Sequence, residues 1–365
     1  MIVKTNTQRK TWIDVGKGLC IVLVVLMHVS LWIENEFNEG PGAFWWLFSE
    51  ALVPIRMPLF FFLSGYLAAN AIKRPLGQSK ARTIGFYYIY VLWTALFLLR
   101  LWLPVPGFDD QPTAGQFLLA LVLPTSFWYL WALAVFFLIA WAAYRFLGEN
   151  SKWLIVPLFG LALTAPAVDA VFRPVLAPPA DPLMFGHMSV NFVWFFAGVH
   201  GRKVWDSLMN RATLSRVCAT TAAYAVAVGA SALFDTVVPM RAVLAAVGLL
   251  AIANVLAFLP LQNKLVKWLE QVGSLTLPVY IFHIFALSAL SGIVKLTGVD
   301  QWIMAFPQLF GALLPPAVAL SLVVASAFIG KLILRSPLSW SLSPRWLQPK
   351  TKNPAGPPPS LRAAS

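Results

Sequence analysis

The chain has 365 residues, of which 59% are hydrophobic and only 11% charged, and its formal net charge is +13. This composition lies far outside the soluble range and predicts an all-α, polytopic membrane helical bundle. Apolar runs long enough to cross a ~30 Å hydrocarbon core recur along the chain, and they lack the alternation expected of a spanning β-barrel.

The basic residues follow a topology and do not mark a nucleic-acid surface. Lysine and arginine concentrate in segments that we assign to the cytoplasm, with five exceptions: Arg173, Arg241 and Lys295 outside, and Arg56 and Arg100 within helices. This positive-inside bias predicts that both termini are cytoplasmic. We expect contact with membrane lipid, no nucleic-acid partner and no bound metal, since the four histidines are far apart in the sequence.

The chain reads as about ten transmembrane spans. In order they cover residues 12–33, 43–72, 83–103, 116–146, 152–171, 187–201, 214–234, 241–260, 272–293 and 307–334. Within the fourth, Pro124 separates a short interfacial helix from a crossing helix that begins at Trp128. Residues 1–340 form a single membrane-embedded domain, and the basic, proline-rich residues 341–365 are predicted to be a disordered cytoplasmic tail.

The first span carries an acid, a base and an imidazole on one side. At ~100° per residue, Asp14, Lys17 and His28 share one stripe, with His28 ~16 Å beyond Lys17. His28 can act as a general base toward a hydroxyl, and Lys17 can hold an anionic group at the inner mouth. The alternatives are a histidine that only packs between helices and a topogenic lysine paired with Asp14.

The second span places Arg56 between Pro54 and Pro58 near the middle of the membrane. Each proline removes a helix hydrogen bond, so a break facing protein or a wet cavity is expected. Arg56 has a functional role, in which it holds a substrate or an acyl oxygen, or a structural one, in which it satisfies the carbonyls freed at Glu50 and Pro54 or pairs with Glu50. Ser64 and Gly65 have structural roles: a hydroxyl bonded to the Phe60 carbonyl and a close helix contact.

Other polar and aromatic residues are candidates for substrate contact. His283 lies midway along the ninth span and fits a core role or a functional one equally well. Trp128 and Tyr129 form either an interfacial aromatic belt or a sugar-stacking surface. Further candidates are the acids Glu50 and Asp235, either of which can orient a histidine, His187 in an external loop, and His200, which reads as a helix-terminus residue.

These segments together resemble the acyltransferase-3 family of integral membrane O-acyltransferases. The resemblance is carried by WIDVGKGLCIVLVVLMH, RMPLFFFLSGYL, SFWYLWALAVFF, FVWFFAGVHGRK and VYIFHIF, and extends from about residue 10 to residue 335. With lysine at position 17 in the first motif, the chain looks most similar to the fucose O-acetylase-like branch, whereas many family members have arginine at this position. The resemblance implies that His28 is the family's essential histidine and that Lys17 is its basic partner.

The resemblance also implies a reaction. An acyl group, usually acetyl, moves from cytoplasmic acyl-coenzyme A to a hydroxyl of an extracytoplasmic carbohydrate in the bacterial inner membrane. The donor phosphates would lie near Asp14, Lys17 and Arg74, and Arg56 would stabilise the oxyanion. The acceptor would contact Glu50, Trp128, Tyr129 and His283. Direct transfer and an acyl-histidine intermediate are both consistent with this arrangement.

Two rival functions remain open. A transporter of a small anion or glycan also uses intramembrane charges and a broken helix, but the VPIRMP segment has no clear counterpart in the second half of the chain. A non-catalytic sensor or assembly protein is the other, and the presence of both Lys17 and His28 argues against it.

Overall fold

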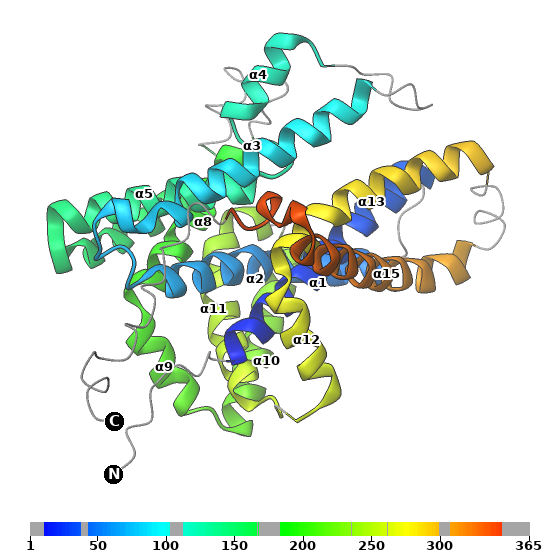
Figure 1. Cartoon of the computed structure of the whole chain (residues 1–365). Helices are drawn as coiled ribbons and strands as arrows, with labels where there is room; N and C mark the ends of the chain where they lie inside the picture. The colour runs from blue at the N-terminus through cyan, green and yellow to red at the C-terminus, as the bar shows by residue number, and fades with distance from the viewer. Residues whose placement is uncertain are drawn as a thin grey trace, which may run out of the picture.

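A computed structural model describes residues 11–37, 43–102, 112–165, 167, 183–234, 236–260, 262–298 and 307–344. This part of the chain is helical and contains no β-strand (Figure 1). The α-helices are α1 (Thr11–Phe37), α2 (Ala43–Ala68), α3 (Ile84–Leu99), α4 (Ala114–Val122), α5 (Trp128–Leu147), α6 (Ile155–Leu163), α8 (Leu183–His200), α9 (Arg202–Asn210), α10 (Leu214–Leu233), α11 (Val237–Phe258), α12 (Lys264–Ser274), α13 (Thr276–Thr297) and α15 (Pro307–Arg335). Short 3-10 helices are η1 (Leu76–Arg82), η2 (Arg100–Trp102), η3 (Gly148–Leu154) and η4 (Pro337–Ser341).

Eight helical stretches in the described residues are long and apolar enough to cross a membrane. The polytopic helical bundle predicted from composition is therefore confirmed. The count of ten spans and the cytoplasmic location of both termini stay predictions. At the end of α15, η4 turns back onto the bundle, where Leu342 is buried and the Ser341 carbonyl accepts the indole N–H of Trp93 at 3.0 Å. The remainder of the predicted tail, residues 345–365, lies outside the described residues.

The predicted division of the fourth span is confirmed. α4 begins at a capping box in which the Thr113 hydroxyl accepts from the Gln116 N–H, and it ends at Leu123, whose backbone is extended. α5 then begins at Trp128. A proline cannot supply the N–H that a continuous helix would need, so the chain turns at Pro124 between the two helices.

Two short amphipathic helices, α9 and α12, were not predicted. Each precedes a long apolar helix. Each buries one apolar face, which includes Trp205 in α9 and Val266 and Val272 in α12, and its charged residues lie away from that face. In the sequence, the basic residues of these two segments indicated cytoplasmic loops. Because charge dominates the composition of such short segments, their amphipathic helical spacing was not recognised.

α2 is continuous through both of its prolines, so the break predicted at Pro54 and Pro58 is wrong. The two prolines leave the carbonyls of Glu50 and Pro54 without their helix donors. The Tyr224 hydroxyl of α10 donates to the neighbouring Ala51 carbonyl at 2.6 Å and so joins α10 to α2 one turn before Pro54.

Glycines allow two close helix crossings. A Cβ added at Gly65 of α2 would collide with the Phe195 carbonyl of α8, and one at Gly198 of α8 would collide with the Phe62 carbonyl of α2. The close packing predicted at Gly65 is confirmed. The same relationship joins α1 to α12, where Gly18 and Gly273 each approach the other helix's backbone. In membranes such small-residue contacts replace the hydrophobic effect as a source of helix association.

α1 runs through the middle of the bundle. It packs against α2, α12, α13 and α15, which surround it in Figure 1. The stripe that carries its polar residues therefore faces protein rather than lipid, and the site is built on this face.

Candidate active site

The inner end of the stripe is an ion pair. Lys17 Nζ lies 3.3 Å from Asp14 Oδ1, and only 17% and 5% of the two side chains are exposed. The ion pair predicted from the three-residue spacing is confirmed. The ion pair lies where α1 crosses α12, because the backbone carbonyl of Asp14 in α1 is the atom closest to Gly273 of α12.

At the outer end, His28 meets a second histidine. His283 Nε2 lies 3.3 Å from His28 Nδ1, and the two rings are 5.1 Å apart. His283 is fully buried, whereas His28 keeps part of its surface open. The sequence had left a core role and a functional role for His283 equally open, and the structure brings it into direct contact with His28.

The surrounding carbonyls identify the protonated ring nitrogens. His28 Nδ1 lies 3.0 Å from the Val24 carbonyl, and His283 Nδ1 lies 2.8 Å from the Val279 carbonyl. Because a carbonyl can only accept, we assign the hydrogen of each neutral ring to Nδ1. The single hydrogen on His28 Nδ1 is then shared between the Val24 carbonyl at 3.0 Å and the lone pair of His283 Nε2 at 3.3 Å, which leaves the lone pair of His28 Nε2 to act as the base.

Of the stripe, Lys17 lines a cavity of about 190 Å³, whereas Asp14, His28 and His283 are not among its lining residues. Two cations, Lys17 and Arg82, lie in its wall, and Ser64, Tyr129 and Tyr280 supply hydroxyl groups. The remainder is apolar: Phe60, Leu67, Ala68, Phe86, Leu130, Leu133, Phe137, Phe195 and Leu277, with Thr276 at the start of α13. The cavity thus extends from the ion pair to Tyr280, which lies one helical turn before His283.

The hydroxyl groups of the cavity are not equivalent. Ser64 Oγ donates to the Phe60 carbonyl at 2.9 Å, as predicted, and also lies 2.8 Å from the Tyr129 hydroxyl. The buried Tyr280 hydroxyl has no hydrogen-bond partner among the described residues. The Tyr280 side chain lines the cavity, but its hydroxyl oxygen is covered in this conformation.

Sequence reasoning missed Tyr280 and Arg82. Tyr280 stands three residues before His283 in the motif VYIFHIF and its ring lies 6.2 Å from that histidine, so the helical spacing was an available signal. Arg82 resembles the other basic residues of its loop, and only the fold shows that it lines the cavity.

Arg56 is buried, with 5% of its surface exposed. Its Nη1 donates to Ser49 Oγ at 3.2 Å, and its Nε has no acceptor among the described residues. The carbonyl bonds considered from the sequence are not among its contacts. Its charge is close enough to act on both His28 and Glu50. The oxyanion role stays a prediction.

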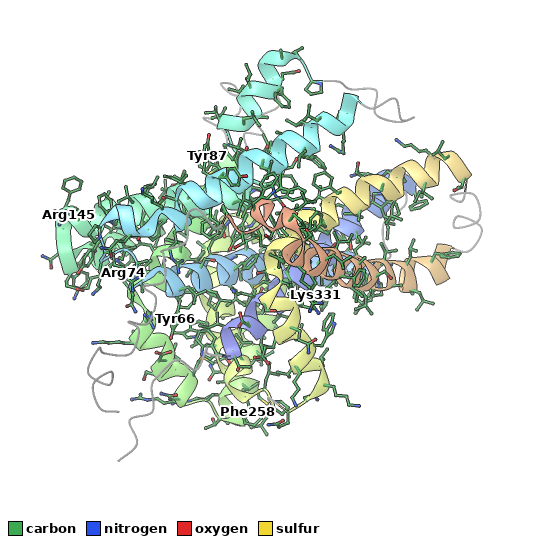
Figure 2. The ribbon with its side chains drawn as sticks, in the orientation of Figure 1. Tyr66, Arg74, Tyr87, Arg145, Phe258 and Lys331 are labelled. Atoms are coloured by element: carbon green, nitrogen blue, oxygen red, sulfur yellow. The ribbon has the colours of Figure 1, made fainter. Side chains whose placement is uncertain are left out.

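Arg74 and Glu50 are exposed. Figure 2 shows Arg74 with Arg145 at one end of the bundle. The adjacent Lys73 donates to Glu149 at 2.8 Å, and this hydrogen bond raises the pKa of the Lys73 ammonium group. The cavity is lined by Arg82 rather than Arg74. The roles predicted for Arg74 and Glu50 stay predictions.

The aromatic candidates lie where α5 begins. Tyr129 lines the cavity and stacks on Phe60 with centroids 4.6 Å apart. Trp128 stacks on the His187 ring of α8 at 5.8 Å. The structure therefore brings Trp128 and His187 together beside the cavity wall, whereas Asp235 lies outside the described residues. His200, at the end of α8 as predicted, contacts Ser151 at 3.4 Å.

The fold and the site together define a membrane-embedded helical protein in which a cavity lined by Lys17, Arg82 and Tyr280 lies near a histidine pair, with the Tyr280 ring 6.2 Å from that of His283. A family model described as an acyltransferase domain matches residues 10–329. The chain belongs to this acyltransferase family, which confirms the family resemblance carried by its motifs. Its assignment to the fucose O-acetylase-like branch stays a prediction.

The curated relatives are partial matches. The chain is 30% identical over 198 residues to the inner membrane protein YcfT of Escherichia coli, covering 46% of this chain and 51% of that protein. It is 31% identical over 150 residues to the nodulation protein NolL of Sinorhizobium fredii, covering 39% and 38%. The chain thus spans about half or less of the length of these relatives. No solved structure matches it significantly.

Proposed function

We propose that this protein is an inner-membrane O-acyltransferase that moves an acyl group, usually acetyl, from cytoplasmic acyl-coenzyme A to a carbohydrate hydroxyl outside the cytoplasm. Two observations carry this proposal: the cavity that joins Lys17 to Tyr280, and the contact between His28 and His283, whose ring lies 6.2 Å from that of Tyr280. Membership of the acyltransferase family supports the reaction class. The name of the relative YcfT, an inner membrane protein, supports the location.

The donor would enter from the cytoplasmic end. Lys17 and Arg82 offer positive charge to its phosphates, and Arg82 is held in place because its Nη2 donates to the Leu67 carbonyl at 2.9 Å. The apolar wall suits the uncharged arm of the donor. The Tyr280 hydroxyl, covered and without a partner among the described residues, would donate to the thioester carbonyl oxygen after its side chain turns into the cavity.

The chemical step then uses the free nitrogen of His28. Its Nε2 accepts the proton of the acceptor hydroxyl while the hydroxyl oxygen attacks the thioester carbonyl carbon. The carbon–sulfur bond breaks, the electron pair leaves on sulfur, and the resulting thiolate takes the proton from the imidazolium. The products are one ester and one free thiol, and His28 returns to its starting state.

The test is a transfer assay with purified protein and acetyl-coenzyme A labelled in the acetyl group. We expect label to reach a glycan acceptor, or slow hydrolysis in its absence, and His28→Ala to abolish both while the variant still purifies as a monodisperse species. A well-folded His28→Ala variant with wild-type turnover would refute the proposal. Donor that is neither bound nor consumed would favour the transporter.

The acceptor is found by mass analysis of surface glycans from cells with and without the protein. A mass difference of one acyl group identifies the donor and the acceptor together. Label retained on His28 after a quenched single turnover would replace direct transfer with an acyl-histidine route.

A further inference from the structure

The cavity of the proposed active site is open at one end and closed at the other. Along α2, its lining residues become more buried toward the middle of the helix: Leu67 is 41% exposed, Ser64 is partly buried and Phe60 is 4% exposed. On α13, Leu277 is likewise partly buried, whereas Tyr280 is 6% exposed. The cavity therefore opens on the side of Leu67 and is closed on the side of Phe60 and Tyr280.

Tyr129 of α5 lines the closed end, and its neighbours hold it in place. Its ring stacks on Phe60 with centroids 4.6 Å apart and meets Tyr280 at 5.6 Å. Its hydroxyl oxygen lies 2.8 Å from Ser64 Oγ. Tyr280 in turn packs on the fully buried Phe127, with centroids 6.1 Å apart. Because protein interiors are close-packed, the Tyr129 ring cannot move aside without losing these contacts, so this end is a rigid wall.

Positive charge lies at the open end of the cavity. Arg82 belongs to this end, since its Nη2 donates to the Leu67 carbonyl at 2.9 Å, and Lys17 keeps 17% of its side chain exposed. Donor phosphates held by these cations leave the uncharged arm of the donor to run inward. The acyl group, at the far end of that arm, then lies deepest in the cavity. This orientation rests on the proposed function.

We propose that Tyr129, held by Ser64 and Phe60, limits the donor to short acyl groups. The acyl carbonyl stops beside Tyr280, because the ring of that lining residue lies 6.2 Å from the His283 ring. The carbons beyond the carbonyl then extend toward the Tyr129 ring. An acetyl group places one methyl there, whereas each further methylene has to displace a packed ring. A closed apolar pocket discriminates against one extra methylene by roughly tenfold or more.

The experiment compares acetyl-, propionyl- and butyryl-coenzyme A on the purified full-length protein. Calorimetry gives the dissociation constant of each donor. Release of the free thiol, which transfer and hydrolysis both produce, gives kcat/KM. We expect the wild type to prefer acetyl over butyryl by roughly a hundredfold in both measurements, as the product of two methylene steps of about tenfold each.

Substitutions at the closed end should relax this preference. Tyr129→Ala removes the wall and should lower the preference for acetyl over butyryl about tenfold or more. Tyr129→Phe keeps the ring but loses the hydroxyl contact with Ser64, so it should lower the preference roughly fivefold. Two matched controls should leave the preference unchanged. Tyr280→Phe removes a hydroxyl from the same end that has no hydrogen-bond partner among the described residues, and Leu67→Ala enlarges the cavity at its open end.

Three results would overturn the proposal: equal use of the three donors by the wild type, a wild-type preference in Tyr129→Ala, or an equal relaxation in Leu67→Ala. Each of them leaves the proposed function standing, whereas a wild-type protein that neither binds nor consumes any acyl-coenzyme A refutes both. Size-exclusion profiles identify a variant that has failed to fold. If Tyr129→Ala fails in this way, Tyr129→Leu makes the same comparison with a smaller loss of packing.

Discussion

The contact between His28 and His283 makes a graded prediction about catalysis. Replacing His283 with Phe keeps a planar ring in a fully buried site but removes the lone pair that accepts from His28 Nδ1–H. Replacing it with Gln restores an acceptor, because the side-chain amide oxygen can take the position of Nε2. The two variants therefore separate the hydrogen bond from the packing.

The expected magnitude follows from how the bond changes during the reaction. The two nitrogens are 3.3 Å apart, and the bond contributes about 0.5–1.5 kcal/mol between neutral rings and about 1.5–3 kcal/mol once His28 is protonated. The difference of about 1–1.5 kcal/mol is present only in the transition state, and its loss is a fall of roughly 5-fold to 13-fold in kcat. Removing the base itself, in His28→Gln, should lower kcat by about 10²–10⁴-fold.

The assay is initial-rate transfer of labelled acetyl groups at saturating donor, with each variant checked for monodispersity. The expected order of activity is wild type, His283→Gln, His283→Phe and, far below, His28→Gln. A His283→Phe variant as inactive as His28→Gln would show that His283 is itself the base. A His283→Phe variant as active as wild type would show that the hydrogen bond between the two histidines does not contribute to catalysis and that the contact is only packing.

Three further predictions concern the cavity and the helix crossing. Lys17→Ala should raise KM for acetyl-coenzyme A about tenfold or more with kcat little changed, since a charge-assisted bond is lost, while Lys295→Ala, at an exposed lysine in the last turn of α13, serves as control; equal KM values in both variants would contradict this. Tyr280→Phe should lower kcat about fivefold, and unchanged kinetics would exclude its hydroxyl from the reaction. Gly65→Ala should lower stability by about 1–3 kcal/mol and reduce the thermal midpoint. Gly229→Ala, where an added Cβ meets nothing within 4 Å, should not, and matching midpoints would show that the crossing can relax.

The features that the sequence predicted are those that one helix or one turn determines. The ion pair of Asp14 and Lys17 follows from helical spacing, and the turn at Pro124 follows from a missing N–H. The close approach at Gly65 follows from the absence of a side chain. In each case a local rule acts without regard to distant segments, which is why one sequence was enough.

The remaining features depend on contacts between segments that are far apart in the chain. His28 and His283 are separated by 255 positions, and nothing local to either histidine identifies the other. Arg82 lines the cavity because η1 packs beside α3 and α5. The continuity of α2 through Pro54 and Pro58 is likewise not determined by its local sequence, since each proline removes a helix hydrogen bond.

The glycine crossing and the histidine pair have a common register. Ten residues separate Gly18 from His28 on the first helix, and ten separate Gly273 from His283 across the α12–α13 junction. Where the backbones of α1 and α12 meet, neither helix can slide without a collision, because each glycine faces the other helix's backbone. A slip of one residue along α1 would move His28 by ~1.5 Å and turn it by ~100°, which would break a contact of 3.3 Å. The crossing near the ion pair therefore also sets the position of the imidazoles, and the site depends on the register of two helices as much as on the identity of its polar residues.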